Sequence, residues 1–107
     1  MKILVTLTAD DIAPRFDLCT EVLIAEFAEG SAGAVPRNVL LPGPSADELC
    51  SLILKENIDV VVCGGIEDSF FQYLVWKKVG VIDRIIGTSA KALQLAFEER
   101  LQPGAVI

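Results

Sequence analysis

The three cysteines are the residues of this 107-residue chain best suited to chemistry, because it contains no histidine. Thiolates bind soft metals and iron–sulfur clusters, and a missing imidazole removes the commonest general base and nitrogen ligand. Cys63 ends an apolar run and is either such a ligand or a buried strand residue. Cys19 stands among polar residues, and both interpretations are open for it as well. Cys50 falls on the apolar face of a predicted helix and is expected in the core.

Several other positions could bind a ligand through backbone groups or charge. Gly64-Gly65 either lets the backbone approach a ligand closely or makes a tight strand-to-helix turn. Arg15 either pairs with a bound anion or forms a surface ion pair. Thr88 and Ser89 begin a predicted helix, whose first N–H groups favour anions.

Charge and motif content exclude several classes of function. The net charge is −6, and Lys77-Lys78 is the only adjacent basic pair, so nucleic-acid and anionic-membrane partners are disfavoured. The run at 3–7 carries no acid for two-metal nuclease chemistry, and a serine or cysteine nucleophile would have no histidine base. An odd cysteine count without a CxxC spacing argues against a disulfide scaffold and a closed zinc site. We therefore expect a binding protein that is not an enzyme.

Composition predicts a single domain over residues 1–107. Hydrophobic residues make up 52% of the chain and the mean hydropathy is +0.52, which excludes disorder. The apolar runs are shorter than the roughly 18 residues of a membrane-spanning helix. The chain enters a strand pattern directly after Met1-Lys2 without a secretory signal, and we expect a cytoplasmic protein with reduced thiols.

The elements that must position these residues follow from hydrophobic periodicity and from turn and capping residues. Apolar runs predict strands at 3–7, 22–27, 34–41, 58–63 and 81–86, with a turn at 29–33 and with Pro36 placing the third strand at a sheet edge. A Ser45–Glu48 capping box starts one helix, a second spans 67–79, and a third runs from Thr88 or Ser89 to a stop at Pro103-Gly104. The order along the chain is β-β-β-α-β-α-β-α.

Connection rules convert this order into a fold. A meander followed by two right-handed crossovers predicts a mixed five-stranded sheet of order 3-2-1-4-5, numbered along the chain, in an α/β three-layer fold of ribonuclease-H-like topology. Ligands in open α/β sheets bind beyond the carboxyl ends of the strands, where connections diverge. We expect the loop at 8–19, the turn at 63–66 and the helix start at 87–89 to converge there.

Four segments together resemble the dinitrogenase iron–molybdenum cofactor biosynthesis family, the NifX and NifB C-terminal type of domain with its orange-protein relatives. They are Met-Lys-Ile-Leu-Val at 1–5, Ala-Pro-Arg-Phe at 13–16, Val-Val-Val-Cys-Gly-Gly-Ile at 60–66 and Gly-Thr-Ser-Ala-Lys-Ala-Leu at 87–93. The resemblance covers nearly the whole chain, and Arg15 and Phe16 match the loop positions of the family. Where the family often has Phe-Gly-Arg, this chain reads Phe16-Asp17-Leu18.

The resemblance implies a non-catalytic, ribonuclease-H-like domain that carries or stores an iron–sulfur or molybdenum-containing cluster and meets donor or acceptor proteins. Its site would combine the 8–19 loop with Cys63, Gly64, Gly65, Thr88 and Ser89. Cys19 and Cys63 would supply sulfur ligands, and Arg15 with the helix N-termini would offset anionic charge.

A rival hypothesis is an interaction or regulatory module that has lost metal binding. It would act through exposed apolar residues around Phe70, Tyr73 and Trp76, with a homodimer as one expected state. A hydrolase on the same fold is a third and disfavoured hypothesis.

Overall fold

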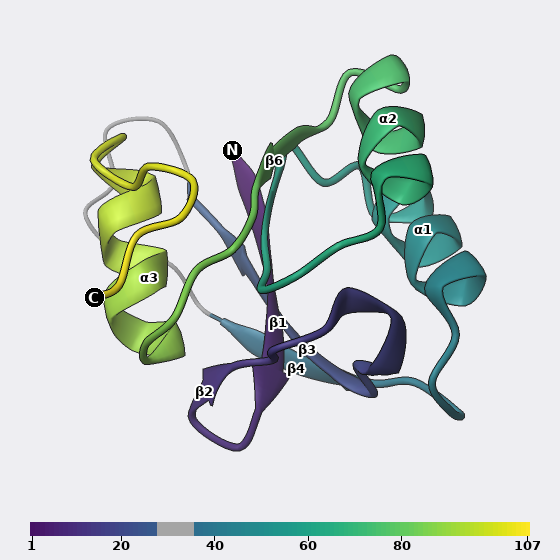
Figure 1. Cartoon of the computed structure of the whole chain (residues 1–107), viewed down its shortest axis with the longest axis horizontal. Helices are drawn as coiled ribbons and strands as arrows, with labels where there is room; N and C mark the ends of the chain where they lie inside the picture. Colours follow the sequence, from purple (N-terminus) through teal and green to yellow (C-terminus); the bar gives the residue numbers. More distant parts are fainter. Residues whose placement is uncertain (28–35) are drawn as a thin grey trace.

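The computed structural model describes residues 1–27 and 36–107, which form an α/β fold with a mixed open sheet of six strands and three helices. The strands are β1 (Lys2–Thr8), β2 (Asp11–Ile12), β3 (Glu21–Glu26), β4 (Arg37–Leu40), β5 (Val60–Val62) and β6 (Gly80–Ile82). Five of them lie side by side in the order β4-β3-β1-β5-β6, and β2 pairs with the end of β1. The expected α/β class with a mixed sheet is confirmed (Figure 1).

The central position of β1 follows from its sequence. Its apolar run is buried on both faces, which requires a strand on each side and a helical layer above and below. Leu4 pairs with Ile24 of β3 in antiparallel register and with Val61 of β5 in parallel register. The sheet therefore changes from antiparallel to parallel at β1, and the connections diverge there.

Three helices cover the sheet: α1 (Ala46–Lys55), α2 (Asp68–Trp76) and α3 (Ser89–Phe97). The predicted caps are present at two of them. Ser45 Oγ accepts the Glu48 N–H at 3.2 Å, and Thr88 Oγ1 accepts the Lys91 N–H at 3.4 Å. Each bond satisfies one of the N–H groups that the first helical turn leaves without a partner.

All three helices end in the same way. Asn57, Lys78 and Glu99 adopt φ values of 55°, 66° and 58°, and the next residue returns an N–H to the last helical turn. At α3, Glu99 N–H donates to Ala96 and Arg100 N–H donates to Leu95, the bond pattern of a Schellman motif. The predicted continuation of this helix to Pro103-Gly104 is wrong, because the left-handed Glu99 ends it first.

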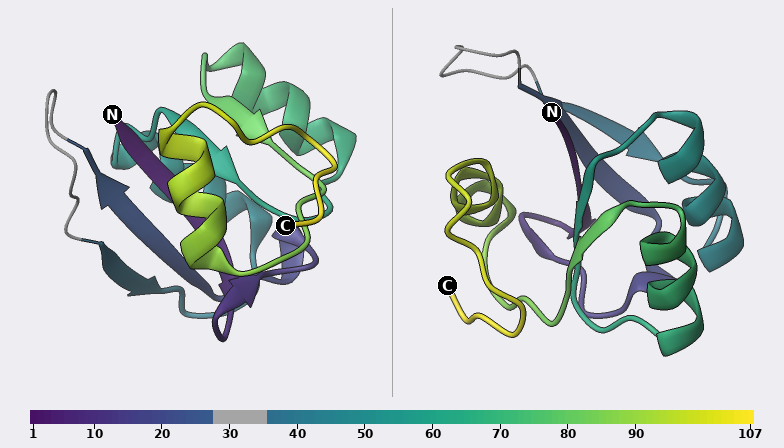
Figure 2. Two further views of the ribbon diagram at one scale, coloured as in Figure 1. Left: turned by 90° about the vertical axis from the view of Figure 1, so that its left-hand side faces the viewer. Right: turned by 90° about the horizontal axis from the view of Figure 1, so that it is seen from above.

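The core has two layers, one on each face of the sheet. On one face, α1 and α2 cover Leu4, Ile24 and Val61; on the other, α3 covers Ile3, Val5 and Val62. Figure 2 shows the sheet between the α1–α2 pair and α3. Strand alternation explains the division, since successive residues of β1 point to opposite faces.

Two other predicted segments differ from the structure because of pairing between distant parts of the chain. The segment expected as plain loop at 8–18 contains β2 and a short helix η1 (Phe16–Leu18), so the sheet has six strands and not five. The strand expected at 81–86 ends at Ile82, and Ile86 instead pairs with Val106. The expected turn at 29–33 and the start of the third strand at 34–35 lie outside the described residues.

Candidate functional site

The loop after β1, the turn after β5 and the start of α3 converge where the sheet changes direction. Gly65 N–H donates to Pro14 at 2.7 Å, and Phe16 N–H donates back to Gly65 at 2.8 Å. Arg15 and Gly65 thereby form a parallel bridge between loop and turn. The connection rules applied to the sequence predict this convergence.

The same loop is tied to α3 by a second group of backbone bonds. Ile12 N–H donates to Gly87 at 3.0 Å, and the Ser89 N–H and Oγ–H both donate to the Asp10 carbonyl, at 2.8 and 2.9 Å. Asp11 and Thr88 form an antiparallel bridge. The loop is thus held from both sides, by the turn at 63–66 and by the N-terminus of α3.

A crevice of about 470 Å³ opens between the loop and the segment that leads into α3. Its lining is mainly apolar, with Asp11 as the one charged side chain and the hydroxyls of Thr8 and Thr88 beside it. The crevice is lined by Thr8, Asp11, Ile12, Pro14, Ile85, Ile86, Gly87, Thr88 and Ile107. The crevice lies beyond the carboxyl end of β1 and includes the loop and the start of α3, but no residue of the turn at 63–66 lines it.

A third of the residues that line this crevice lie outside the segments that the sequence predicts for it. Ile85, Ile86 and Ile107 form much of its apolar wall, yet none was a candidate. Ile107 N–H donates to Ile86 at 2.9 Å, and a Cβ on Gly87, which has φ +148°, would overlap the Ile107 side chain. Two adjacent isoleucines before a glycine were the only available signal, because nothing local places Ile107 beside them.

The glycine pair serves the chain's own packing. A Cβ on Gly64 would lie 2.6 Å from the Pro14 carbonyl oxygen and would also overlap the Ala13 carbonyl oxygen. Gly65 uses both of its backbone hydrogen-bonding groups on the 14–16 segment. The close approach at Gly64 is therefore to the loop, and of the two interpretations the tight turn describes the observed geometry.

Arg15 forms a bidentate ion pair with Asp17. Its Nε donates to one carboxylate oxygen at 3.0 Å and its Nη2 to the other at 2.6 Å. The Arg15 side chain is 61% exposed, so the pair lies at the surface beside a small pocket formed by Thr8, Pro14 and Leu18. A bound anion would have to compete with Asp17 for the guanidinium.

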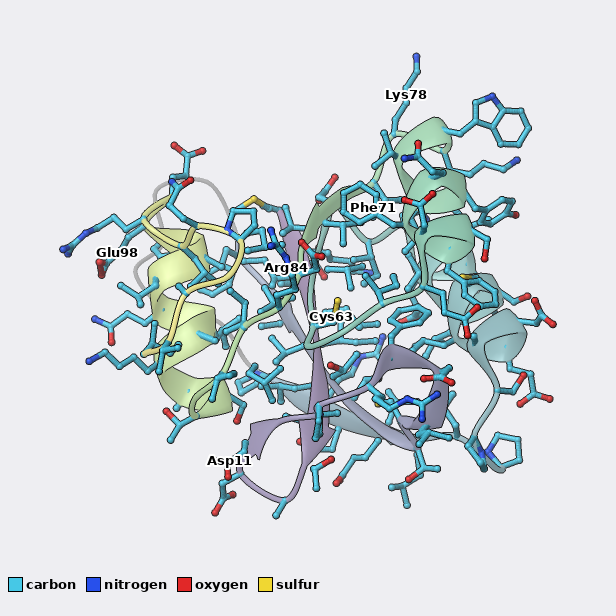
Figure 3. The ribbon with its side chains drawn as sticks, in the orientation of Figure 1. Asp11, Cys63, Phe71, Lys78, Arg84 and Glu98 are labelled. Carbon is cyan, nitrogen blue, oxygen red and sulfur yellow. The ribbon has the colours of Figure 1, made fainter. Side chains whose placement is uncertain are left out.

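Phe16 and the two candidate thiols lie inside the core. Phe16 is buried and packs against Phe70, with ring centroids 6.2 Å apart. Cys63 has no exposed surface, and Cys19 is buried with its thiol donating to the Glu21 carbonyl at 2.9 Å. Figure 3 shows Cys63 in the interior and Asp11 at the periphery. Cys19, Cys63, Ala13 and Phe16 share one core cluster, so the loop covers the thiols.

Burial keeps these thiols protonated. Desolvation, with smaller contributions from the charges of Asp83 and Cys19, raises the pKa of Cys63 to about 12. Desolvation also raises the pKa of Cys19, against backbone hydrogen bonds that lower it. A metal must therefore displace a proton from each thiol it binds. Within residues 1–27 and 36–107, no three cysteine or carboxylate side chains are grouped to hold a metal ion.

The two expected helix N-termini differ. Thr88 and Ser89 stand at the start of α3, but Ser89 N–H already donates to Asp10. At α2 the N-cap is Glu67 and the first residue is Asp68, so two acidic residues stand at the positive end of the helix dipole. Only the α3 end borders the crevice.

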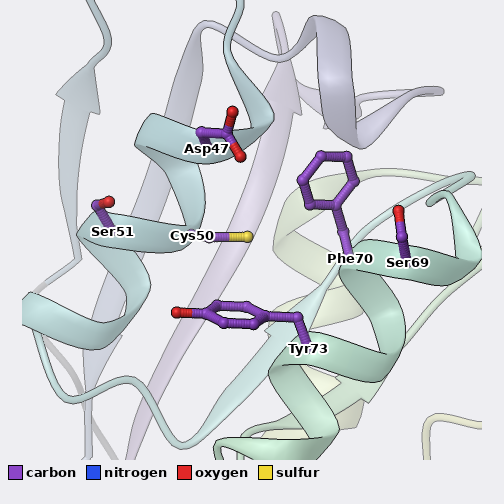
Figure 4. Close-up of a pocket in the computed structure, with 6 residues that line it drawn as sticks. All are labelled: Asp47, Cys50, Ser51, Ser69, Phe70 and Tyr73. Carbon is purple, nitrogen blue, oxygen red and sulfur yellow. The ribbon is translucent and has the colours of Figure 1, made fainter.

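A separate pocket of about 420 Å³ lies between α1 and α2. Cys50 is buried, as expected, but its thiol points into this pocket between the rings of Phe70 and Tyr73 (Figure 4). Asp47, Ser51 and Ser69 complete the lining. The pKa of Cys50 is raised to about 11 by burial and by the charge of Asp47.

Among the described helices, none has the length and apolar character needed to cross a bilayer.

A sequence model of the dinitrogenase iron-molybdenum cofactor family matches residues 1–99. The crystal structure of PH0822 superposes with a TM-score of 0.83 at 13% identity, over 96% of this chain and 94% of that one. An NMR structure of a Thermotoga protein, TM1290, described as a candidate NifB protein of the DUF35 family, superposes at 0.71 with 14% identity, over 95% and 91%. At these identities the two structures show a shared fold alone. No curated protein matches the chain.

Proposed function

This chain belongs to the dinitrogenase iron-molybdenum cofactor family, and on that premise we propose that it is a non-catalytic carrier or storage domain for an iron–sulfur or molybdenum-containing cluster or its precursor. Donor and acceptor proteins of cofactor assembly are its partners. The observation that carries the proposal is the position of the 12–16 loop segment, which has the crevice on one side and the Cys19–Cys63 core on the other.

Cargo would enter at the crevice. Its apolar walls exclude water from a bound cluster, and the Thr8 and Thr88 hydroxyls can donate to cluster sulfur or oxygen. The α3 N-terminus adds a partial positive charge, and Arg15 lies on the other side of Pro14. These two groups favour an anionic cargo, whereas the Asp11 carboxylate in the crevice lining opposes one.

Thiol ligation would require the loop to move. Pro14 and Phe16 are held to the turn by the two bonds to Gly65, and Phe16 is buried in the same core cluster as the two thiols. Release of this segment would open a path from the crevice to Cys63 and Cys19. Each metal–sulfur bond then formed releases one proton to solvent.

Anaerobic reconstitution of the metal-free protein with ferrous iron, sulfide and molybdate tests the proposal. We expect charge-transfer absorbance and bound metal in the parent and in Cys50→Ser, which keeps the site intact. Cys19→Ser and Cys63→Ser should lose most of the bound metal. Equal uptake by all variants would remove the ligand assignment, and no uptake by the parent would remove the carrier function.

The second candidate function, an interaction or regulatory module without metal, is favoured by one specific observation. Trp76 is 72% exposed on α2, although tryptophan usually lies largely buried. Protein purified anaerobically without metal, but in a stable complex, would favour this function over the carrier.

Two further assignments accompany the proposal. The sheet order β4-β3-β1-β5-β6, with antiparallel and parallel halves, supports a ribonuclease-H-like fold. All three cysteines are free thiols, which supports a reducing compartment such as the cytoplasm.

A further inference from the structure

The outer face of α2 carries an unusual stripe of side chains. Ser69, Gln72, Tyr73 and Trp76 follow one another at the i, i+3, i+4, i+7 spacing of a single helix face, and all four are exposed. Tyr73 is 38% and Trp76 72% exposed. The apolar stripe that α2 turns toward the core is separate and centres on Leu74. The outer stripe is therefore available for a contact.

Trp76 is held as a projecting knob. The Lys77 ammonium lies 4.6 Å from its ring centroid, and the Tyr73 ring packs beside it with centroids 6.2 Å apart. A cation over the indole face and a neighbouring ring restrict its rotation. Ordering such a side chain in advance lowers the entropy that an interface would lose on forming.

The same molecule presents a hole beside this stripe, and Ser69 and Tyr73 belong to both. The pocket of about 420 Å³ between α1 and α2 has two aromatic walls, Phe70 and Tyr73, and the thiol of Cys50 at its base (Figure 4). Ser69 at its rim is small and leaves the entrance open. Asp47 places a carboxylate at the same rim.

Knob and hole match when two α2 helices lie antiparallel. The stripe is symmetric about its midpoint, so reversing one copy sets Trp76 opposite Ser69 and Gln72 opposite Tyr73. A two-fold axis through this midpoint makes both contacts at once, as an isologous interface requires. The antiparallel arrangement also sets the two helix dipoles in opposite directions, which is favourable.

Two oppositely charged residues, Lys77 and Asp47, favour contact between two copies of the chain. The chain carries −6 overall, so two copies repel each other except where a basic group meets an acidic one. Lys77 projects beside Trp76 and would reach the pocket rim of the opposite copy, where Asp47 lies. This contact occurs twice in a symmetric pair.

We propose that a second copy of this chain is the occupant of the α2 face, with Trp76 of each copy inserted into the α1–α2 pocket of the other and Lys77 facing Asp47. The inference specifies the partner of the second candidate function. It is independent of cluster binding, because the crevice and the 12–16 loop lie elsewhere. Its test therefore uses metal-free protein.

Sedimentation over a range of protein concentrations, from low micromolar to near-millimolar, measures the dimer directly. Trp76 is the only tryptophan, so its emission should shift to the blue as the dimer forms. Trp76→Ala should weaken the dimer by about 30-fold or more, as truncation of a central tryptophan does. Leu40→Ala, on an equally exposed residue of β4, is the matched control and should leave the dimer unchanged.

Charge reversal tests the orientation. Lys77→Glu and Asp47→Lys should each weaken the dimer by about tenfold, and the double variant should recover to within about threefold of the parent. Lys91→Glu on α3 makes the same charge change away from the interface and should have no such effect. Parent protein that stays monomeric, or a dimer indifferent to Trp76→Ala, would overturn the proposal. A small molecule found in the α1–α2 pocket of monomeric protein would do the same.

Discussion

The amide of Gly65 and the carbonyl oxygen of Pro14 lie 2.7 Å apart, in the hydrogen bond that joins the loop after β2 to the turn after β5. This bond and its reciprocal partner from Phe16 position the loop over the two buried thiols. The turn therefore holds in place the loop that lines the crevice and that separates Cys63 from it.

Gly64→Ala should destabilise the protein more than Gly65→Ala does. The added Cβ would meet the Pro14 carbonyl oxygen at 2.6 Å from position 64, but at 3.3 Å from position 65. We expect losses of about 3 kcal/mol and about 1 kcal/mol in the free energy of unfolding. Urea unfolding of both variants measures the difference, and equal losses would mean that the loop does not pack on Gly64 as described.

The stability of the protein should fall above pH 9, in part through Cys63. Its pKa is raised from 9.0 to about 12 by folding, so the unfolded chain releases this proton first and binds fewer protons than the native state. Deprotonation then favours unfolding, by about 1.4 kcal/mol for each pH unit between these two values.

Denaturant unfolding of the parent and of Cys63→Ala between about pH 8 and about pH 10 isolates this contribution. The variant should start from a lower stability and lose it less steeply as pH rises. Cys50→Ala should flatten the profile over a narrower range, because the pKa of Cys50 rises only to about 11. Parallel profiles for the parent and Cys63→Ala would show that this thiol titrates normally.

Asp17→Asn should free Arg15 without harming the fold. The ion pair is at the surface, with the Arg15 side chain 61% exposed, so we expect a stability change within about 0.5 kcal/mol. If Arg15 helps to hold anionic cargo, this variant should take up more cluster in reconstitution and Arg15→Gln should take up less. Thermal unfolding provides the control for folding, and identical uptake by the three proteins would exclude a role for this arginine.

Glu99→Gly should stabilise the protein by about 1 kcal/mol. Glu99 has φ 58° at the end of α3, a conformation that costs a residue with a Cβ about that much and costs glycine little. The midpoint of thermal unfolding should rise, whereas Glu98→Gly, at the preceding C-cap residue with φ −78°, should lower it. A loss of stability in Glu99→Gly would show that the Glu99 side chain makes a contact of its own.

Much of the secondary structure could be predicted because its signals are local. Continuous apolar runs marked β1 and β5, and the Ser45 and Thr88 caps marked the starts of α1 and α3. Chain-connection rules then brought the loop, the turn and the α3 start to one end of the sheet. These predictions depend on hydrophobic periodicity, on helix-capping residues and on the handedness of crossover connections. Each of these is a property of one segment or of two connected segments.

Details within the loop could not be predicted. Arg15 and Asp17 stand two residues apart, and only the η1 turn between them brings their side chains into a bidentate pair. Phe16 is buried because Phe70 of α2 lies opposite it, more than fifty residues later in the chain. Strand β2 has two residues and no periodicity of its own; it exists because β1 offers a free edge at Leu7 and Thr8.

Taken alone, the sequence determined which residues had to be buried, which class of fold could bury them, and that histidine chemistry is missing from this protein. Only the tertiary structure decided that Cys19 and Cys63 lie in one core cluster with Ala13 and Phe16, and that Ile107 lines the crevice. The physical reason is distance along the chain. Hydrophobic pattern and capping act over a few residues, whereas exposure and pKa depend on groups that folding brings together from far apart.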